Sequence, residues 1–192
     1  MSTERSGLAT HQRMSYRRKK LFRGVRRVFT PAWFVSVYYL LRCRSKISMR
    51  AEVEINPNLQ LGADCWVGSF AKIKSGDGVL SIGDRARIAT GCFIASGAAN
   101  LMIGRNFIAG PHVRIVASNY RHHQKNMHLE DLGSVSRGIT IGHNVWIGGG
   151  TTVTDGSQIG DNTIVVANSL VNRKFPPDVI LQGNPARIIA RR

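Results

Sequence analysis

The sequence is short of cysteine and of long apolar runs. Its three cysteines, Cys43, Cys65 and Cys92, do not provide a framework of paired disulfides, so we interpret them as neutral thiols in a reducing cytoplasm. The apolar run at 32–41 has about half of the ~20 residues that a membrane-spanning helix needs. With 192 residues, the chain has room for one domain with its own core and an appendage.

Acidic residues are also scarce, and the imbalance of charge is local. The chain has 27 Lys and Arg against 11 Asp and Glu, a net charge of +16. Residues 1–50 hold 13 of those cations and one acid, Glu4, so this segment carries +12 and residues 51–192 carry only +4. The charge therefore bears on localisation more than on chemistry. No base-reading element or stacking platform accompanies it, so nucleic acid is not expected as a partner.

Residues 1–28 are interpreted as a basic, flexible tail and residues 29–50 as an N-terminal helix. Thr30 and Pro31 are typical of the N-cap and the first position of a helix, and the helical run ends in cations, as the helix dipole favours. Arginines interrupt the apolar residues that follow the basic run at 17–20, so this start does not match a secretory signal. Two interpretations of the helix stay open. Either it packs on the first coils or on another subunit, or its aromatics enter a membrane while the basic residues meet anionic lipids.

An aliphatic residue returns at every sixth position near the C-terminus. The positions are Ile141, Ile147, Val153, Ile159, Val165 and Val171. Neither the 3.6-residue period of a helix nor the alternation of a simple strand gives this spacing. A six-residue repeat is typical of a parallel β-helix, in which each hexad supplies one short strand and one turn and stacked coils bury one another's apolar edge.

The same spacing occurs earlier in the chain, with small residues at a second fixed position. It is kept by Ile55, Leu61, Val67, Ile73, Ile82, Ile88, Ile94, Ile103, Ala109 and Ile115. The small position, four residues after the aliphatic, is filled by Cys65, Ala71, Ala86, Cys92, Val145, Thr163 and Ser169. We therefore predict a β-helix over 51–174, with small turns or loops at 74–80 and 95–101.

One stretch of about twenty residues, 116–137, holds no hexad. A long excursion of this kind inside a compact repeat is usually functional or disordered, and the polar content favours function. Its notable residues are Asn119, Tyr120, Arg121, His122, His123, His128, Glu130 and Asp131. The hexads resume at Gly138. The prolines at 176 and 177 are expected to close the β-helix, because proline cannot donate to a strand ladder, and residues 175–192 are expected to form a C-terminal tail.

A family resemblance is carried by three segments: 141–153 (IGHNVWIGGGTTV), 159–164 (IGDNTI) and 182–189 (QGNPARII). Together with the hexads they resemble the hexapeptide-repeat (left-handed β-helix) acyltransferases, and among them the maltose/galactoside O-acetyltransferase-like branch. The resemblance implies an all-β fold, a left-handed parallel β-helix. The left hand comes from the resemblance alone, because ordinary parallel crossovers are right-handed.

The resemblance also implies an activity and a setting. It points to a homotrimeric acetyltransferase that uses acetyl-CoA and a hydroxyl of a sugar or glycan precursor, in polysaccharide biosynthesis. The expected location is cytoplasmic, with peripheral contact at the inner face of the cell membrane as an option. No Ser-His-Asp set or reactive cysteine is evident, so we expect direct transfer without an acyl-enzyme.

Acyl transfer from a thioester needs a base for the acceptor proton, a donor for the oxyanion, and both substrates held close. Histidine suits the first task, and in the family it lies in this loop, after a GPxVxI segment. Residues 110–115 match the start of that pattern, but Tyr120 stands where the resemblance implies His, and tyrosine is a poor base at neutral pH. His122 is the first candidate for the base and His123 the second. The alternative is that both are solvated and the enzyme is degenerate.

The resemblance further implies that coenzyme A lies along the last coils, in a groove between two subunits. The matching residues are Gly149, Ala167, Asn172, Arg173 and Arg187. A small residue at 149 lets the pantetheine approach, and residue 167 offers backbone groups. The two arginines suit phosphates because guanidinium is a permanently charged fork. Lys174 is a further candidate for contact with the phosphates.

Two other classes of function stay open. A β-helix kept only as a scaffold for oligomerisation would explain Tyr120. The γ-carbonic anhydrases share the fold and bind zinc through three histidines, and His123 and His128 superficially match part of that spacing. A third, properly placed histidine on the coils is not evident, so no metal is expected. His112 and His143 occupy hexad turns and are interpreted as surface residues.

Overall fold

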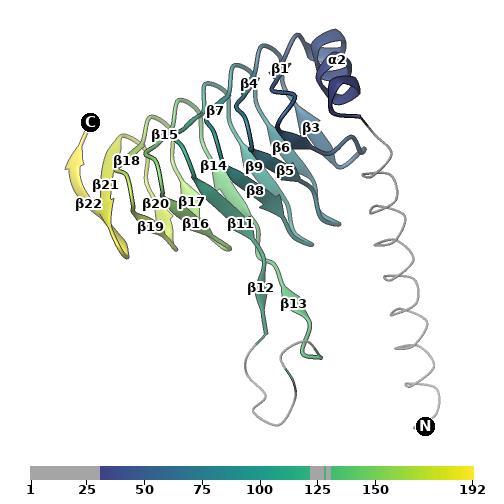
Figure 1. Ribbon diagram of the computed structural model, residues 1–192. Helices are drawn as coiled ribbons and strands as arrows, with labels where there is room; N and C mark the ends of the chain where they lie inside the picture. Colours follow the sequence, from purple (N-terminus) through teal and green to yellow (C-terminus); the bar gives the residue numbers. More distant parts are fainter. Residues whose placement is uncertain (1–30, 122–127, 129–130) are drawn as a thin grey trace, which may run out of the picture.

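The computed structural model describes residues 31–121, 128 and 131–192, which form a stack of three-sided coils with one helix at its N-terminal end (Figure 1). Sheet A holds β1 (Lys46–Ile47), β4 (Trp66–Val67), β7 (Arg87–Ile88), β10 (Ile108–Ala109), β15 (Trp146–Ile147), β18 (Ile164–Val165), β21 (Val179–Gly183) and β22 (Ala186–Arg191). Sheet B holds β2 (Glu52–Val53), β5 (Lys72–Lys74), β8 (Phe93–Ser96), β11 (Arg114–Ala117), β16 (Thr152–Thr154) and β19 (Leu170–Val171). Sheet C holds β3 (Leu59–Leu61), β6 (Leu80–Ile82), β9 (Leu101–Ile103), β14 (Ile139–Ile141), β17 (Gln158–Ile159) and β20 (Lys174–Phe175).

Consecutive strands belong to consecutive sheets, so the chain winds once round the stack for every three strands. Each strand pairs in parallel with the strand one coil further on; Val67 of β4 lies beside Ile88 of β7, for example. Two places depart from this rule: β22 turns back and pairs antiparallel with β21, and β12 (Asn119–Tyr120) pairs antiparallel with β13 (Ser134–Val135) outside the three sheets. The described part of the chain is therefore the left-handed parallel β-helix that the sequence predicts.

The core is a set of aliphatic columns, one behind each sheet. Behind sheet B, for example, Ile73, Ile94 and Ile115 stack in register and are fully buried. The small residues of the hexads are buried beside these columns, as expected: Cys65, Ala71, Ala86, Cys92, Val145, Thr163 and Ser169. One assignment was wrong: Val53, which pairs beside Ile73, fills the inward place of β2, whereas Ile55 lies half-buried in the following corner.

The corners explain the glycine and asparagine content of the hexads. From residues 62 to 169, every corner from sheet C to sheet A and from sheet A to sheet B places its third residue at positive φ; these are Asp64, Phe70, Arg85, Gly91, Asn106, His112, Asn144, Gly150, Asn162 and Asn168. Glycine, asparagine and aspartate tolerate that region best. The first residue of a corner meets the next coil closely: a Cβ on Gly83 would lie 2.6 Å from the Arg105 amide nitrogen. Glycine therefore follows the aliphatic residue because the stacked backbones leave no room for a side chain there.

The helix α2 (Ala32–Cys43) covers the first coil. Its buried face consists of Val35 and Tyr39, and the Tyr39 hydroxyl donates to the Glu54 carbonyl at 2.7 Å. Burial raises the pKa of that hydroxyl well above its usual value. The Ser36 hydroxyl donates to the Ile47 carbonyl at 2.9 Å. One face of the helix thus packs on the first coil, as the first interpretation of this segment predicts, and its other face stays exposed. No helix in the described part of the chain is long and apolar enough to span a membrane.

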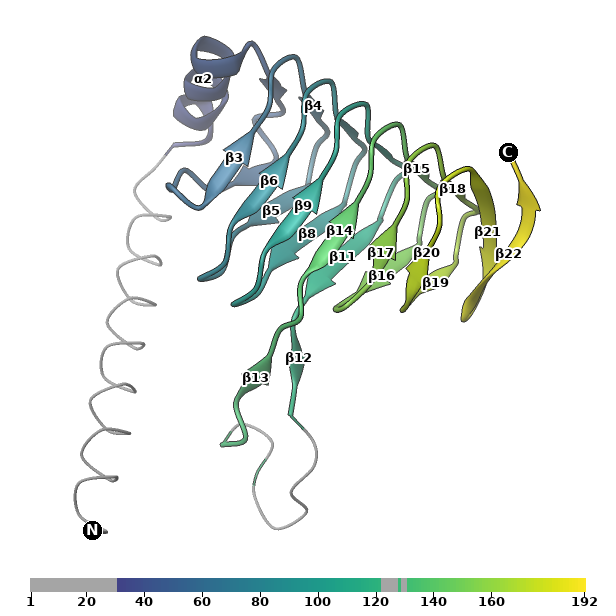
Figure 2. The same ribbon diagram turned by 180° about the vertical axis from the view of Figure 1, so that it is seen from behind.

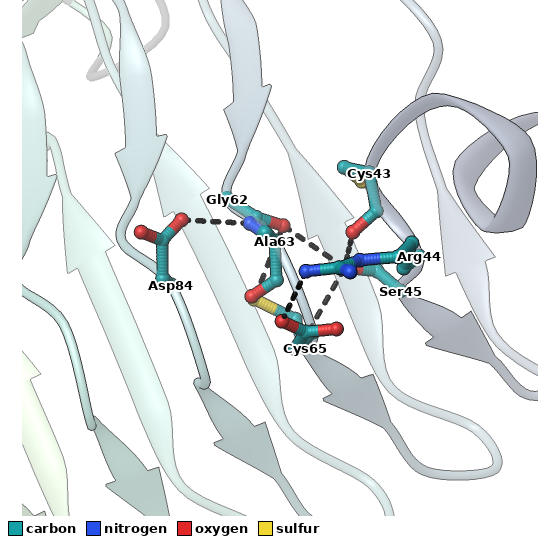
Figure 3. A network of polar contacts seen from close by, with 8 residues as sticks. Cys43, Arg44, Ser45, Gly62, Ala63, Cys65 and Asp84 are labelled. Atoms are coloured by element: carbon teal, nitrogen blue, oxygen red, sulfur yellow. Dashed lines mark hydrogen bonds and ion pairs between the residues drawn. The ribbon is translucent and has the colours of Figure 1, made fainter.

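The β-helix begins earlier in the sequence and ends later than expected. The helix ends at Cys43 and not near residue 50, because Arg44 adopts positive φ and the chain turns into β1. A network at this junction ties the helix end to the first coils (Figure 3): the Ser45 hydroxyl donates to the Gly62 carbonyl and accepts from the Cys65 amide, both at 2.9 Å. The expected tail at 1–28 and the Thr30 cap lie outside the described residues.

The C-terminal segment is not a tail. Residues 175–192 were expected to follow the β-helix, but β20 and β21 complete another turn and β22 closes sheet A (Figure 2). The two prolines lie in the corner between β20 and β21, where a missing N–H breaks no ladder. The prediction that they close the β-helix was therefore wrong.

Candidate functional site

Coils differ in length at one corner only. From residue 62 to residue 169, the corners from sheet C to sheet A and from sheet A to sheet B always have four residues. The corner from sheet B to sheet C varies; its segments are 54–58, 75–79, 97–100, 118–138, 155–157 and 172–173. The long loop is thus an enlargement of the corner that already varies in the neighbouring coils, and it starts at residue 118 instead of 116.

The loop leaves the body on a two-stranded stalk. In it, β12 (Asn119–Tyr120) pairs antiparallel with β13 (Ser134–Val135), and the Arg121 amide donates to the Gly133 carbonyl at 3.1 Å. The stalk projects away from the stacked coils (Figures 1 and 2). Its side chains are mostly exposed, Tyr120 at 66%. The described strands of the stalk therefore lie outside the chain's own core.

Hydrogen bonds fix the base of the stalk to the body. The Ser136 hydroxyl donates to the Ala117 carbonyl, across the two ends of the loop, and accepts from the Ala99 amide at 3.1 Å. The Asp155 carboxylate accepts from the Arg137 and Gly138 amides, each at 2.8 Å. Since Ala99 and Asp155 belong to the coils on either side, the loop is anchored to both neighbours.

The candidate bases His122 and His123 lie outside the described residues. Around them, Tyr120 and His128 are exposed, and the Asp131 amide donates to the His128 carbonyl at 2.9 Å. The assignment of the base therefore stays a prediction.

The other two coil histidines are turn residues, as the sequence predicts. His112 is exposed at positive φ, with its ring over Gly91, where a Cβ would lie 2.4 Å from Nδ1. The Nδ1 atom of His143 accepts from the Arg105 amide at 3.0 Å, and its own amide donates to Asp161 at 2.7 Å. Both rings therefore contact the turn of a neighbouring coil.

Two of the residues assigned to coenzyme A lie side by side. Gly149 and Ala167 are the second residues of successive corners between sheets A and B, and the Asn168 amide donates to the Gly149 carbonyl at 2.9 Å. A Cβ on Gly149 would meet the Pro111 carbonyl at 3.1 Å, so the residue is small for a local packing reason as well. This corner exposes backbone with little side-chain cover.

The other residues assigned to coenzyme A are Asn172, Arg173 and Arg187, at the C-terminal end of the same coils. Asn172 and Arg173 make up the last corner between sheets B and C and are exposed. The Arg173 guanidinium donates to the Ala186 carbonyl at 2.9 Å, next to Arg187, and lies 5.5 Å from the Phe175 ring centroid. The hydrogen bond and the ring hold the guanidinium in place, which lowers the entropic cost of binding an anion there.

The stalk and the glycine corner lie on opposite edges of sheet B. The stalk follows the C-terminal end of β11, whereas Gly149 precedes the N-terminal end of the adjacent β16. A strand of three or four residues separates these edges by about 10 Å. Among the described residues of one chain, the stalk and the glycine corner are therefore one strand length apart.

The cysteines are not candidates for a nucleophile. Cys65 and Cys92 are buried, and this burial raises the pKa of both thiols above the usual value. The thiolate fraction at neutral pH is correspondingly small. In residues 31–121, 128 and 131–192, His, Cys, Asp and Glu side chains do not gather in threes that could hold a metal ion. His123, which the zinc alternative requires, lies outside those ranges.

Comparison with known proteins identifies the repeat. Residues 138–173, which include the glycine corner and Arg173, match the family described as bacterial transferase hexapeptide (six repeats). The match covers this segment of the chain. The N-acyltransferase AntD from Bacillus cereus, solved in complex with dTDP and 3-hydroxybutyryl-CoA, shares the fold of this chain. The TM-score is 0.67 at 19% sequence identity, over 78% of this chain and 80% of AntD.

Two relatives of this chain come from Escherichia coli. A galactoside O-acetyltransferase is 36% identical over 87 residues, 45% of this chain and 42% of that enzyme. A putative lipopolysaccharide biosynthesis O-acetyl transferase, WbbJ, is 27% identical over 179 residues, 88% of this chain and 87% of WbbJ. The matched part thus spans less than half of the first relative and most of the second. These likenesses confirm the resemblance to hexapeptide-repeat acetyltransferases.

Removing the Asp155 carboxylate tests the anchor of the loop. In Asp155→Ala, the Arg137 and Gly138 amides lose their acceptor, so they exchange hydrogen roughly 5- to 150-fold faster, corresponding to about 1–3 kcal/mol. Hydrogen exchange followed by mass spectrometry on peptides that span 134–141 measures this. Asp64→Ala is the control, because that exposed carboxylate pairs with Arg44 in an outer turn. Equal exchange in wild type and Asp155→Ala would show that the anchor is elsewhere.

Proposed function

We propose that this protein is a cytoplasmic O-acetyltransferase that moves an acetyl group from acetyl-CoA to a hydroxyl of a sugar or glycan precursor. The observation that carries the proposal is a glycine corner at 148–150 on the coils that match transferase hexapeptides, with Arg173 at the other edge of sheet B on the same coils and Arg187 next in sequence to the Ala186 that Arg173 contacts. The names of the two E. coli relatives support the reaction class and a carbohydrate acceptor.

The reaction needs little more than positioning and one base. The base takes the proton from the acceptor hydroxyl as its oxygen attacks the thioester carbonyl carbon. The C–S bond then breaks, and the coenzyme A thiolate leaves and takes up a proton. A backbone N–H at the glycine corner is the proposed donor to the oxyanion, because amides held by neighbouring coils are already oriented. No cofactor other than the acetyl-CoA co-substrate and no metal enters this scheme.

The base is proposed to be His122, with His123 as the second candidate. Loss of a general base typically lowers rates by 10²–10⁴-fold. His122→Ala should therefore lower kcat by roughly that factor while the KM for acetyl-CoA stays near that of the wild type, and His123→Ala should do less. Thiol release and mass spectrometry of the acetylated product, with a panel of sugars as acceptors, measure both effects.

Two further variants make this experiment decisive. His112→Asn is the control, because it replaces an exposed turn histidine by a residue that tolerates positive φ, and it should keep the wild-type rate. Tyr120→His should change little or lower the rate if His122 is the base. If the wild type transfers nothing and Tyr120→His restores activity, the chain is a lapsed enzyme. The scaffold alternative rests on the exposed Tyr120 at the family's histidine position.

The proposed coenzyme A site is tested at its two arginines. Each exposed charge pair contributes roughly 0.2–1 kcal/mol, so Arg173→Ala with Arg187→Ala should raise the KM for acetyl-CoA by about 2- to 30-fold and change kcat less. Arg105→Ala is the control, because that exposed side chain lies in a corner between sheets C and A. An unchanged KM in steady-state kinetics would mean that the groove lies elsewhere.

We also propose that two copies of the chain complete each site, within a homotrimer. The stalk and the glycine corner lie on opposite edges of sheet B, and this separation supports a site that takes the loop from one copy and the corner from another. A heterologous contact that closes with threefold symmetry gives three equivalent sites. The outward row of sheet A, with Trp66, Ile108 and Trp146 at 41%, 45% and 51% exposure, is the proposed contact surface.

The assembly is tested by placing a charge in that row. Trp146→Asp buries a carboxylate between two uncharged neighbours of the row, Ile108 and Ile164, so the mass from light scattering should fall from that of a trimer toward that of a monomer. Thr140→Asp, on the outward row of sheet C, should leave the mass unchanged. A stable monomer of the wild type at micromolar concentration would contradict the trimer and the shared site together.

A further inference from the structure

The face of α2 that points away from the β-helix is apolar. It is formed by Trp33, Phe34, Val37, Leu40 and Leu41, with exposed fractions of 60%, 46%, 44%, 48% and 81%. At 3.6 residues per turn these side chains fall within roughly a third of the helix circumference. A solvent-facing helix surface is ordinarily polar, so a continuous apolar face on it marks a contact surface.

Packing fixes the direction of this face. Val35 and Tyr39 lie on the opposite side of the helix, where they are buried against the first coil. The Tyr39 and Ser36 hydroxyls donate to the Glu54 and Ile47 carbonyls, at 2.7 and 2.9 Å. The apolar face therefore cannot turn inward without breaking these hydrogen bonds. It is presented at the N-terminal end of the stack, at the opposite end from β22 (Figure 1).

The charge around the face has one sign. Residues 31–51 include Arg42, Arg44, Lys46 and Arg50, all exposed, and no acidic residue. Arg44 does pair with Asp64, but both side chains are exposed and the pair is therefore weak. With the basic residues that precede the helix in sequence, residues 1–50 carry a net charge of +12.

The sequence before the helix repeats the same arrangement of residue types. Leu21, Phe22, Val25, Val28 and Phe29 have the spacing of the five exposed residues of α2, and Arg23, Arg26 and Arg27 lie between them. Two successive segments thus combine aromatic and aliphatic residues at helical spacing with arginine. This combination is typical of segments that lie in a membrane interface, where aromatics enter the headgroup region and cations meet anionic lipids.

We propose that α2 docks this apolar face on an anionic lipid membrane surface. A second copy of the chain fits the face less well, because it would bring another strongly basic segment against the first, and like charges oppose such a contact. A nucleic acid would use the positive charge and leave Trp33 and Leu41 exposed to water. A lipid surface matches both the apolar face and the positive charge, since it offers an apolar layer beneath a layer of negative headgroups. The inference is independent of the acetyl transfer proposed above.

The test is vesicle flotation of the full chain. We expect it to float with vesicles of phosphatidylcholine and phosphatidylglycerol, and much less with phosphatidylcholine alone. Trp33→Ser with Leu41→Ser should weaken binding about tenfold or more, because each buried side chain of this size contributes about 1.5–3 kcal/mol when it leaves water. Ile189→Ser is the matched control: it removes an equally exposed apolar side chain, at 56%, from the far end of the stack. Added salt should weaken binding of the wild type.

Any one of four results would overturn the proposal. The first is absence of wild-type binding to the anionic vesicles, and the second is equal binding by the Trp33 and Leu41 variant. The third is a lower mass of that variant by light scattering, since it would mean that a second copy covers the face. Trp33 fluorescence, in a chain with Trp66→Phe and Trp146→Phe, provides a readout that leaves the face intact. Quenching by lipids with brominated acyl chains is expected, and its absence would also contradict docking.

Discussion

Parallel stacking of coils is the constraint on which the rest of the structure depends. One coil has an apolar edge behind each of its three strands and cannot cover any of them by itself, so stability comes from the contact between coils. The columns of Ile73, Ile94 and Ile115 exist only because each coil repeats the inward position of the one before. The same register brings the backbones of successive corners so close that Gly83 has no room for a Cβ. Core and corners are therefore set by one geometric requirement.

Stacking leaves two open ends, and the chain closes them in different ways. At the N-terminal end α2 covers the first coil with Val35 and Tyr39, and the Ser45 network fastens its end to the coils. At the C-terminal end β22 turns back along β21, so sheet A finishes with an antiparallel strand. The first solution leaves a helix surface available for contacts outside the chain, whereas the second places Arg187 beside the last corner.

The sequence predicts the parts that repeat and misses the parts that do not. The hexad period and its small residues are imposed on many positions at once, so single exceptions do not hide the pattern; even so, Ile55 was taken for the inward residue in place of Val53. The extra turn at the C-terminus was not predicted, because two prolines are compatible both with a corner and with the end of the β-helix. Only the pairing of β21 shows that they lie in a corner. The stalk is two residues on each side, which is too short for a pattern to reveal. The antiparallel register of Tyr120 with Ser134 depends on anchors from two other coils. Of the site, the glycine corner and the arginines could be named from the resemblance, while their separation from the stalk follows only from the winding.

The anchored base of the loop has a consequence for how freely the loop can vary. Between Ile88 and Ala109 one circuit takes 21 residues, and between Ala109 and Ile147 it takes 38. Because closure entropy grows only with the logarithm of length, this difference costs about 0.5 kcal/mol. Ser136 and Asp155 bring both ends back to the same places whatever lies between them. A change in the number of residues between 121 and 133 therefore costs little closure entropy, so chain closure constrains the length of this segment only weakly.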